Sequence, residues 1–290
     1  MNAKATRQIE EMKKQTIGVE VEMNSISRRK AAKLAADFFG TGRFQDTAHR
    51  NGYCTWSAWD TQGREWKFQR DSSIHGPDDE KCELVTPILT YADMETLQEL
   101  IRKLRKAGAK SDASRGCGVH IHIGAKGHTP QTLRNLVNIM ASHESLLISA
   151  LNLNRYRVTQ YCRTVDPNFL TQVNKKKPTS MADLADVWYT SHGASWGRSQ
   201  HYNDSRYHML NLHATFTKGT VEFRLFQFDK PSDGKQNGYF RDDLSINDIT
   251  KAYAMFERGL MYDWCICNGN YSLCQYSAAM MPLFLKSFCK

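Results

Sequence analysis

The sequence predicts an α+β fold, in which an antiparallel sheet is backed by helices. Several segments alternate apolar and polar residues with a period of two, as strands with one buried face do. Other segments repeat apolar residues at the spacing of one helix face. Short loops join several of the predicted strands, and such loops favour antiparallel neighbours.

Helical spacing predicts four helices. The first covers 28–39 and stops at Gly40, because glycine readily adopts the left-handed conformation that ends many helices. The second covers 92–107. The third covers 129–151, where a proline in the first turn suits a helix start. A serine and an aspartate three residues apart begin the fourth helix, over 245–264.

Period-two segments predict the strands. A turn at 61–63 joins two of them into a hairpin, and Gly219 joins another pair. Residues 154–205 are rich in aromatic side chains and show no clear period. We therefore expect an N-terminal extension over 1–15, followed by a single domain over 16–290 with an irregular insertion at 154–205. The predicted strands cover 16–23, 53–59, 64–70, 82–86, 118–123, 208–216 and 219–228.

The composition is that of a soluble globular protein with a net charge of +9. No apolar run approaches the roughly 18 residues of a membrane span, and the N-terminal residues lack the apolar stretch of a secretory signal. We therefore expect a cytoplasmic protein without membrane contact. The eight cysteines include no CxxC pair of the kind that binds zinc, so we expect free thiols. Nucleic acid or a phosphate-rich substrate could each explain the charge.

Two strands place ionisable side chains opposite their apolar residues. Glu20 and Glu22 alternate with apolar residues in IGVEVEM, and His120 and His122 do so in VHIHI. Side chains two positions apart on a strand share a face. A solvent-exposed face explains the two glutamates equally well, whereas two histidines in an otherwise apolar strand favour a site.

Two further segments repeat this pattern. Glu222 and Arg224 share a face of TVEFRLF, where a structural salt bridge is the alternative, and Glu83 is the single acid in CELVTPIL. If these faces converge, four carboxylates are crowded, which is electrostatically unfavourable without cations. Carboxylates with an imidazole suit Mg²⁺ or Mn²⁺. Several acids beside an arginine predict more than one ion and phosphoryl-transfer chemistry.

Six segments occur in the order found in the amidoligase family, which is similar to glutamine synthetase and glutamate–cysteine ligase in its catalytic sheet. They span roughly residues 16–260, and ExE, HxH and TxEFR in this order are specific together, although each motif is weak alone. The resemblance implies a curved antiparallel sheet of the glutamine-synthetase-like type. The segments are GVEVEM, the DSSI turn, CELVTPIL, GVHIHIG, RYRVTQYCR and RYHMLNLHATFTKGTVEFRLF.

The resemblance also implies a set of metal ligands. The two acids of the first strand would each serve one of two ions, and the acid of CELVTPIL would be a further ligand of the first ion. The second ion would take one imidazole of the HxH strand, His120 in preference to His122, and would be completed by the acid of TxEFR. The implied ligands are Glu20, Glu22, Glu83, His120, His122 and Glu222.

The implied activity is that of a ligase that uses ATP with Mg²⁺ or Mn²⁺ to join a carboxylate to an amine through an acyl-phosphate. Arg224 would contact the transferring γ-phosphate, and Arg206 and Asn211 would line the phosphate or substrate side. Asp71 and Ser73 occupy the usual DxS turn of the family, with Asp71 among the catalytic residues and Ser73 among those that bind the nucleotide. A peptide or protein, an amino acid, a polyamine and a cell-wall fragment all fit as substrates.

Three other functions remain open at this point. A phosphotransferase similar to guanidino kinases would use the same metals and arginines without a ligation step. A zinc or iron enzyme would use His120 and His122 with a carboxylate, but it leaves the other acids and Arg224 without a role. A nucleic-acid-binding module explains the positive charge alone, and no known nucleic-acid motif occurs in the sequence.

Overall fold

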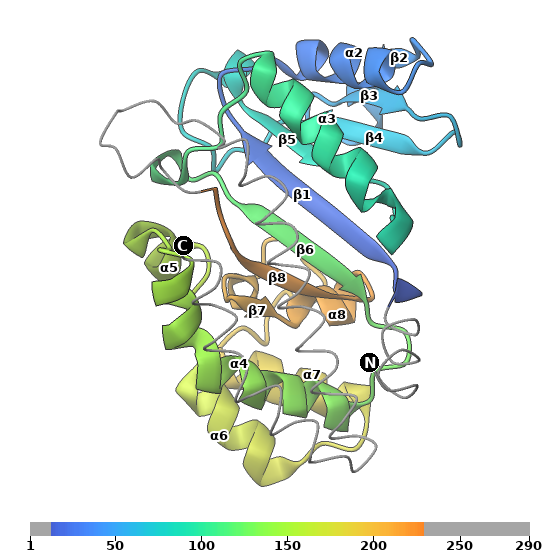
Figure 1. The fold of residues 1–290 in the computed structure, drawn as a ribbon. Helices are drawn as coiled ribbons and strands as arrows, with labels where there is room; N and C mark the ends of the chain where they lie inside the picture. Colours follow the sequence, from blue (N-terminus) through green and yellow to red (C-terminus); the bar gives the residue numbers. More distant parts are fainter. Residues whose placement is uncertain (1–12, 229–290) are drawn as a thin grey trace, which may run out of the picture. The chain divides into compact units, whose positions relative to one another are not determined.

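The computed structural model describes residues 13–228, and the helix predicted over 245–264 lies outside them. The described chain forms two compact units. We call residues 16–123 of one the strand-rich unit and residues 124–224 of the other the helical unit. The elements of both are labelled in Figure 1, and they confirm the predicted α+β class with antiparallel strand pairing.

The strands of the strand-rich unit lie in the order β2-β3-β4-β5-β1-β6, and each neighbouring pair is antiparallel. The predicted hairpin of β3 and β4 is confirmed, whereas the short β2 was not predicted. The bounds are Ile17–Met23 for β1, Phe44–Asp46 for β2, Trp56–Trp59 for β3, Glu65–Gln69 for β4, Cys82–Val85 for β5 and Val119–Gly124 for β6.

One face of this sheet is apolar. Val21 pairs directly with Val119 on β6 and with Leu84 on β5, and Leu84 pairs with Phe68 on β4. All four side chains are buried. Because residues directly opposite each other share a face, this row marks the apolar face, and residues one position away along each strand point to the other face.

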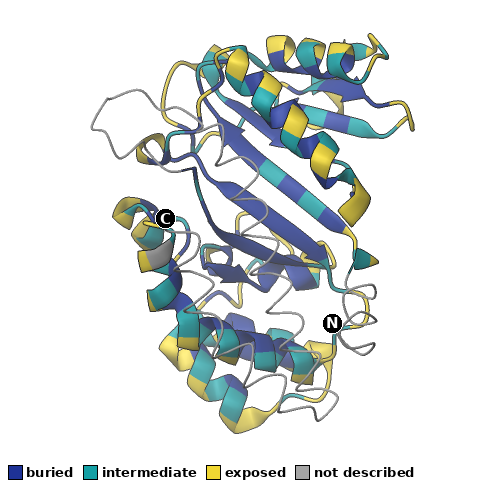
Figure 2. Cartoon of the chain, viewed as in Figure 1, coloured by how far each residue is buried: buried dark blue, intermediate teal, exposed yellow. Residues whose placement is uncertain are grey.

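Two helices, α2 (Arg28–Phe38) and α3 (Met94–Lys106), cover the apolar face (Figure 1). Phe39, at the end of α2, packs on Trp66, which lies two residues from Phe68 and so on the same face. In Figure 2 the strands beneath are largely dark blue, and the outer surfaces of both helices carry exposed residues. The same unit also contains short 3₁₀ turns, which consist of residues Ala48–Arg50, Asp78–Glu80, Tyr91–Asp93 and Ala113–Arg115.

The helical unit consists of packed helices and one short strand pair. α4 packs on α6, α6 on α7, and α7 on α8, and β7 pairs antiparallel with β8. β8 extends two residues beyond the unit. The bounds are Pro130–Ala150 for α4, Arg155–Gln160 for α5, Pro167–Lys176 for α6, Met181–Ser191 for α7, Asp204–Arg206 for a 3₁₀ turn, Leu210–Asn211 for β7, His213–Thr217 for α8 and Thr220–Phe226 for β8.

The strand predicted over 208–216 is wrong beyond Asn211, because residues 213–217 form α8. The side-chain oxygen of Asn211 accepts a 2.8 Å hydrogen bond from the backbone N–H of His213. Such local bonds draw a chain out of an extended conformation. Gly219, with φ of +71°, then returns the chain to β8, and the predicted antiparallel pairing about this glycine is confirmed.

Residues 154–205, expected to be irregular, contain α5, α6 and α7. A side-chain cap starts each helix, from Asn154, Asp166 and Ser180 respectively. Their aromatic residues form a buried contact, in which the rings of Phe169 and Trp188 meet edge to face at 4.8 Å. The segment is therefore a helical layer. The extension over 1–15 and the single domain over 16–290 stay predictions.

Free thiols were expected, and Cys54 and Cys82 are free thiols in the described part of the chain. No helix within residues 13–228 has both the length and the apolar character needed to cross a membrane.

Candidate active site

The strand-rich unit gathers carboxylates and imidazoles on the face opposite its apolar row. β1 supplies two acids, β5 one, β6 both imidazoles, and the segment after β4 one more acid. The register explains this grouping, because Glu20 lies opposite His120 and Glu22 lies opposite Glu83. We call these side chains the acidic cluster: Glu20, Glu22, Asp71, Glu83, His120 and His122.

Glu20 bridges the two imidazoles. Its Oε2 lies 3.1 Å from Nδ1 of His120, and its Oε1 lies 3.2 Å from Nε2 of His122. Nε2 of His120 lies 3.8 Å from Oε1 of Glu22. Both imidazoles and Glu22 are buried, so water screens the interactions among these groups only weakly. The structure thus brings together the first-strand acids and the HxH pair.

Two hydrogen bonds orient the remaining acids. The backbone N–H of Gly118 donates to Oε2 of Glu22 at 2.6 Å. The side-chain amide of Gln69, on β4, donates to Oε2 of Glu83 at 2.8 Å. Sequence reasoning missed Gln69. Its signal was available, because Gln69 shares the strand face opposite Phe68 and so projects toward the acids.

Glu83 is held in surroundings that oppose its negative charge. Burial raises the pKa of Glu83 well above its ordinary value, and the carboxylates of Glu20, Asp71 and Glu22 raise it further. The hydrogen bond from Gln69 has a smaller, opposite effect on this pKa. A cation among these oxygens would favour the charged form instead.

The donor atoms of the acidic cluster fit a divalent cation. Glu20, Glu83 and His120 each offer one ligand atom, and these atoms lie within 4.8 Å of one another. A second set, Glu22, Asp71 and Glu83, meets the same limit and shares Glu83 with the first. Such oxygen-rich sets, with one imidazole at most, match the preference of Mg²⁺ and Mn²⁺.

Asp71 lies in a tight turn that a glycine holds in place. Its Oδ1 accepts a 2.6 Å hydrogen bond from the backbone N–H of Ser73. A Cβ atom at Gly116 would approach the backbone oxygen of Ser73 to 2.6 Å, and this glycine has φ of +86°. Only glycine suits both constraints. The sequence predicted a catalytic role for Asp71, and its place beside Glu22 and Glu83 was not foreseen.

The helical unit holds a second group of predicted site residues. Oε1 of Glu222 accepts a 2.5 Å hydrogen bond from Nη1 of Arg224, and its Oε2 accepts one of 2.7 Å from Nδ2 of Asn211. All three side chains are buried. Glu222 and Arg224 therefore share a strand face as predicted, and within this unit they form the ion pair that was the structural alternative. The role of Glu222 as a metal ligand stays a prediction.

Tyr207 brings the two predicted phosphate-binding arginines together. The guanidinium of Arg206 lies 5.7 Å from the centre of the Tyr207 ring, and that of Arg224 lies 5.8 Å from it. Contacts of this length are cation–π interactions. Arg206 also donates to the backbone oxygen of His201 at 3.1 Å. Sequence reasoning missed Tyr207, although an aromatic residue directly after Arg206 was a visible signal.

Comparison with known proteins identifies a family for this chain. No curated protein and no solved structure matches the sequence significantly. Residues 13–231 match the family model described as "Putative amidoligase enzyme". This match includes the acidic cluster and the group around Glu222 and Arg224. The chain therefore belongs to the amidoligase family, and is an enzyme of the ligase type.

Proposed function

We propose that this protein is an ATP-dependent ligase that joins a carboxylate to an amine through an acyl-phosphate. The observation that carries the proposal is the set of Glu20, Glu83 and His120, whose ligand atoms lie within 4.8 Å of one another in a chain of the amidoligase family. Buried acids crowded in this way suit divalent cations, and divalent cations are what ATP chemistry requires.

The acidic cluster would hold the cations. Glu20, Glu83 and His120 would bind one ion, and Glu22, Asp71 and Glu83 would bind another. When bound, Mg²⁺ or Mn²⁺ supplies charge neutralisation for the phosphate oxygens of ATP. Gln69 and the backbone N–H of Gly118 keep two of the carboxylates in their orientation, so that little reorganisation is needed on binding.

The arginines would act on the phosphates. Arg224 would donate to the oxygens of the γ-phosphate. Arg206, whose guanidinium contacts the same Tyr207 ring, would donate to neighbouring phosphate oxygens. A planar guanidinium can give two parallel hydrogen bonds to phosphate oxygens. Asn211 and Ser73 would complete the surroundings of the nucleotide. Glu222 keeps the Arg224 guanidinium in place through their ion pair.

The proposed reaction has two steps. A carboxylate oxygen of the first substrate attacks the γ-phosphorus of ATP, the bond from this phosphorus to the β,γ-bridging oxygen breaks, and ADP leaves. The amine of the second substrate then attacks the carbonyl carbon of the acyl-phosphate, phosphate leaves, and the amine gives up a proton. The protein contributes positioning and stabilisation of the developing charge.

The contacts favour this function over the alternatives. A zinc or iron enzyme built on the HxH pair would leave Glu22, Asp71 and Glu83 crowded without a role, and the oxygen-rich donor set suits harder ions. A kinase similar to guanidino kinases would use the same residues for the first step alone. The choice between ligase and kinase therefore rests on the fate of the phosphate.

Nucleotide analysis during turnover tests the proposal. We expect ADP and phosphate as products, ADP formation that depends on the carboxylate, and phosphate release that accelerates with the amine. Hydroxylamine should trap the acyl-phosphate as a hydroxamate. AMP as the main nucleotide product, or a stable phosphorylated product without phosphate release, would each overturn the mechanism. The Glu20→Gln variant serves as the inactive control.

The substrates can be found with the same enzyme. A mass-spectrometric product screen would combine ATP and Mg²⁺ with mixtures of carboxylates and amines, including peptides, amino acids, polyamines and cell-wall fragments. An amide or isopeptide product should accumulate with the wild-type protein and be missing with Glu20→Gln. No increase in any condensed product over this control, across all mixtures, would count against ligation.

A further inference from the structure

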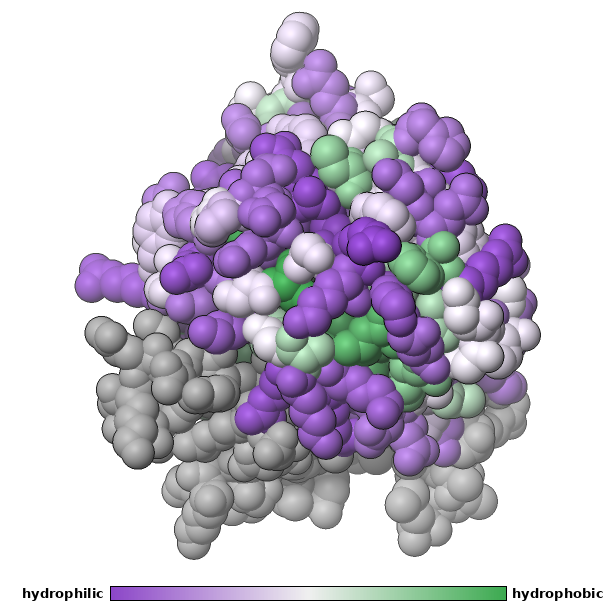
Figure 3. Space-filling model, turned by 90° about the horizontal axis from the view of Figure 1, so that it is seen from above, coloured by the Kyte–Doolittle hydropathy of each residue, from purple (hydrophilic) through white to green (hydrophobic). Residues whose placement is uncertain are grey.

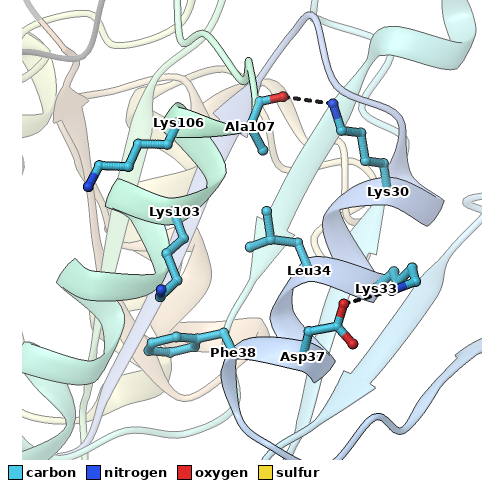
Figure 4. Close-up of a pocket in the computed structure, with 8 residues that line it drawn as sticks. All are labelled: Lys30, Lys33, Leu34, Asp37, Phe38, Lys103, Lys106 and Ala107. Atoms are coloured by element: carbon cyan, nitrogen blue, oxygen red, sulfur yellow. Dashed lines mark hydrogen bonds and ion pairs between the residues drawn. The ribbon is translucent and has the colours of Figure 1, made fainter.

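A groove with a positively charged rim lies between α2 and α3, on the opposite side of the sheet from the acidic cluster. Figure 3 shows apolar residues between hydrophilic ones on the face seen from above, and Figure 4 shows the groove itself. Its volume is about 610 Å³, which is within the usual range for binding sites of small ligands. The lining residues are Lys30, Lys33, Leu34, Asp37, Phe38, Lys103, Lys106 and Ala107.

The floor of the groove is apolar. Leu34 and Phe38 lie four positions apart on α2, so they share one face of that helix. Both are half-buried, which leaves part of each side chain open to the groove (Figure 4). Partly exposed leucine and phenylalanine side by side can bury an aliphatic side chain of a ligand.

The rim carries four ammonium groups and one carboxylate. Two of the ammonium groups already have partners, because Lys33 pairs with Asp37 at 2.7 Å and Lys30 donates to the backbone oxygen of Ala107 at 2.7 Å. Lys30 thereby links α2 to the last turn of α3, where a cation also meets the negative end of the helix dipole.

The other two ammonium groups are available. Lys103 and Lys106 lie three positions apart on α3, so they are neighbours on the helix surface. Both are exposed, and neither forms an ion pair within residues 13–228. The ammonium of Lys103 lies 5.7 Å from the centre of the Phe38 ring, so one of these charges stands directly beside the apolar floor.

We propose that this groove binds an acidic peptide segment of a partner protein. Two carboxylates of the segment would pair with Lys103 and Lys106, and one aliphatic side chain would pack on Leu34 and Phe38. The chemistry favours a peptide over a nucleic acid. Sites for single-stranded nucleic acid add exposed aromatic rings on which bases stack, whereas the aromatic ring in this lining, that of Phe38, is half-buried. The lining holds no arginine that could form a bidentate pair with phosphate oxygens.

The test measures fluorescence anisotropy of a labelled peptide with the full-length protein. The probe is a peptide of alternating glutamates with one central leucine. Three competitors are compared with it: the same peptide with serine for leucine, a single-stranded oligonucleotide of equal charge, and vesicles containing anionic lipid. We expect the leucine peptide to bind best and its binding to weaken with salt, because exposed charge pairs are screened.

Matched variants locate the site. Lys103→Gln/Lys106→Gln should weaken binding about fivefold or more, as expected for the loss of two exposed ion pairs. Leu34→Ser should weaken binding of the leucine peptide and leave binding of the serine peptide unchanged. The control is Lys175→Gln/Lys176→Gln, which removes two lysines from the last turn of another helix, α6. Thermal unfolding of each variant checks the fold, and Lys106→Gln alone replaces the double variant if the latter unfolds.

Each outcome decides the matter. Weakened binding in the groove variants with normal binding in the control supports the peptide site. Equal weakening in the control means general attraction to a basic protein and overturns it. Tighter binding of the oligonucleotide or of the vesicles replaces the peptide with another class of partner. Equal binding of the leucine and serine peptides shows that the apolar floor has no part and also overturns the proposal. None of these results depends on ligase activity.

Discussion

The side-chain amide of Gln69 donates a 2.8 Å hydrogen bond to Oε2 of Glu83 across the β4–β5 pair. This bond stabilises the charged form of an acid whose pKa is raised by burial and by neighbouring carboxylates. Glu83 belongs to both candidate ligand sets. The hydrogen bond from Gln69 therefore orients a carboxylate that both candidate ligand sets share.

Gln69→Leu should weaken Mg²⁺ binding about tenfold or more, the range for lost partners of metal ligands. The variant leaves Glu83 without its donor, so a larger part of the binding energy goes into ionising this acid. Thermal shift against Mg²⁺ concentration measures the effect. Gln45→Leu, at an exposed position of β2, is the control. Equal Mg²⁺ midpoints for Gln69→Leu and the wild-type protein would contradict the role given to this bond.

Two glutamate-to-glutamine changes should have opposite effects on stability. Glu20→Gln removes one of several crowded acids, so the melting temperature without Mg²⁺ should hold or rise, while stabilisation by Mg²⁺ shrinks and turnover is lost. Glu222→Gln leaves the buried Arg224 guanidinium without its anion and should cost about 3 kcal/mol of unfolding free energy.

Urea unfolding of both variants, with and without Mg²⁺, makes the comparison. If Glu20→Gln proves the less stable of the two without metal, repulsion is not a feature of the acidic cluster. If the Glu222→Gln variant is as stable as the wild-type protein, the ion pair between Glu222 and Arg224 does not stabilise the fold.

Arg224→Lys should lower turnover about tenfold or more, which corresponds to about 1.4 kcal/mol of transition-state stabilisation. Lysine keeps the positive charge but loses the planar fork that matches phosphate oxygens. The free energy of unfolding should fall by less than the transition-state stabilisation that is lost, because an ammonium can still pair with Glu222. Arg163→Lys, a conservative change at an arginine that bonds backbone oxygens, is the control. A loss of only twofold would leave Arg224 a structural residue.

Glu144 should make stability fall as pH rises. Burial raises the pKa of this carboxyl from 4.5 to about 7, against the opposite effect of the hydrogen bond from the backbone N–H of Val165. The folded state therefore holds a proton that the unfolded state releases at lower pH. Its stabilising effect is full below about pH 4.5 and is lost as pH rises to about 7.

Glu144→Gln keeps an oxygen that can accept the bond from Val165 and removes the ionisation. Its unfolding free energy should exceed that of the wild-type protein at pH 8, and the difference should disappear at pH 4.5. Glu95→Gln, an exposed acid on α3, should follow the wild-type profile. A difference between Glu144→Gln and the wild-type protein that is the same at both pH values would refute this assignment.

His208 should act in the opposite pH direction. Burial lowers its pKa to about 4, and the neighbouring His192, whose ring lies 4.6 Å away, adds to this effect. The folded state then binds its proton less readily than the unfolded state. Stability should be fully present above pH 6.5 and decline as pH falls toward 4. In His208→Leu this decline should be smaller, and in His49→Leu, at an exposed histidine, it should match the wild-type protein.

The sequence predicts the strand-rich unit well because period-two alternation is a local signal. The alternation of Glu20 and Glu22 with apolar residues requires one polar face, and the register then brings this face against His120 and Glu83. Asp71 was predicted as a catalytic residue through the family resemblance, but its place beside Glu22 and Glu83 was not predicted, and neither was the bond from Gln69 to Glu83. Their position depends on strand pairing and on the turn packed against Gly116.

The helical unit was harder to predict because short-range hydrogen bonds override the residue pattern there. Asn211 turns the chain from β7 into α8 through one side-chain bond, although residues 208–216 alternate like a strand. Asn154, Asp166 and Ser180 are helix caps that the irregular composition of 154–205 concealed. Capping residues in an aromatic segment were the signal that could have found these helices.

The pairing of β1 has a consequence for how this chain folds. Contacts between β1 and the segment around β6 join residues 96 to 100 positions apart, so β1 is synthesised well before this partner. At about 5–20 residues per second, the ribosome needs about 5–20 s to produce this partner. Until then Ile17, Val19 and Val21 lack their final neighbour, and the unpaired strand edge is open to other chains. Slower synthesis should therefore lower the yield of native protein through aggregation.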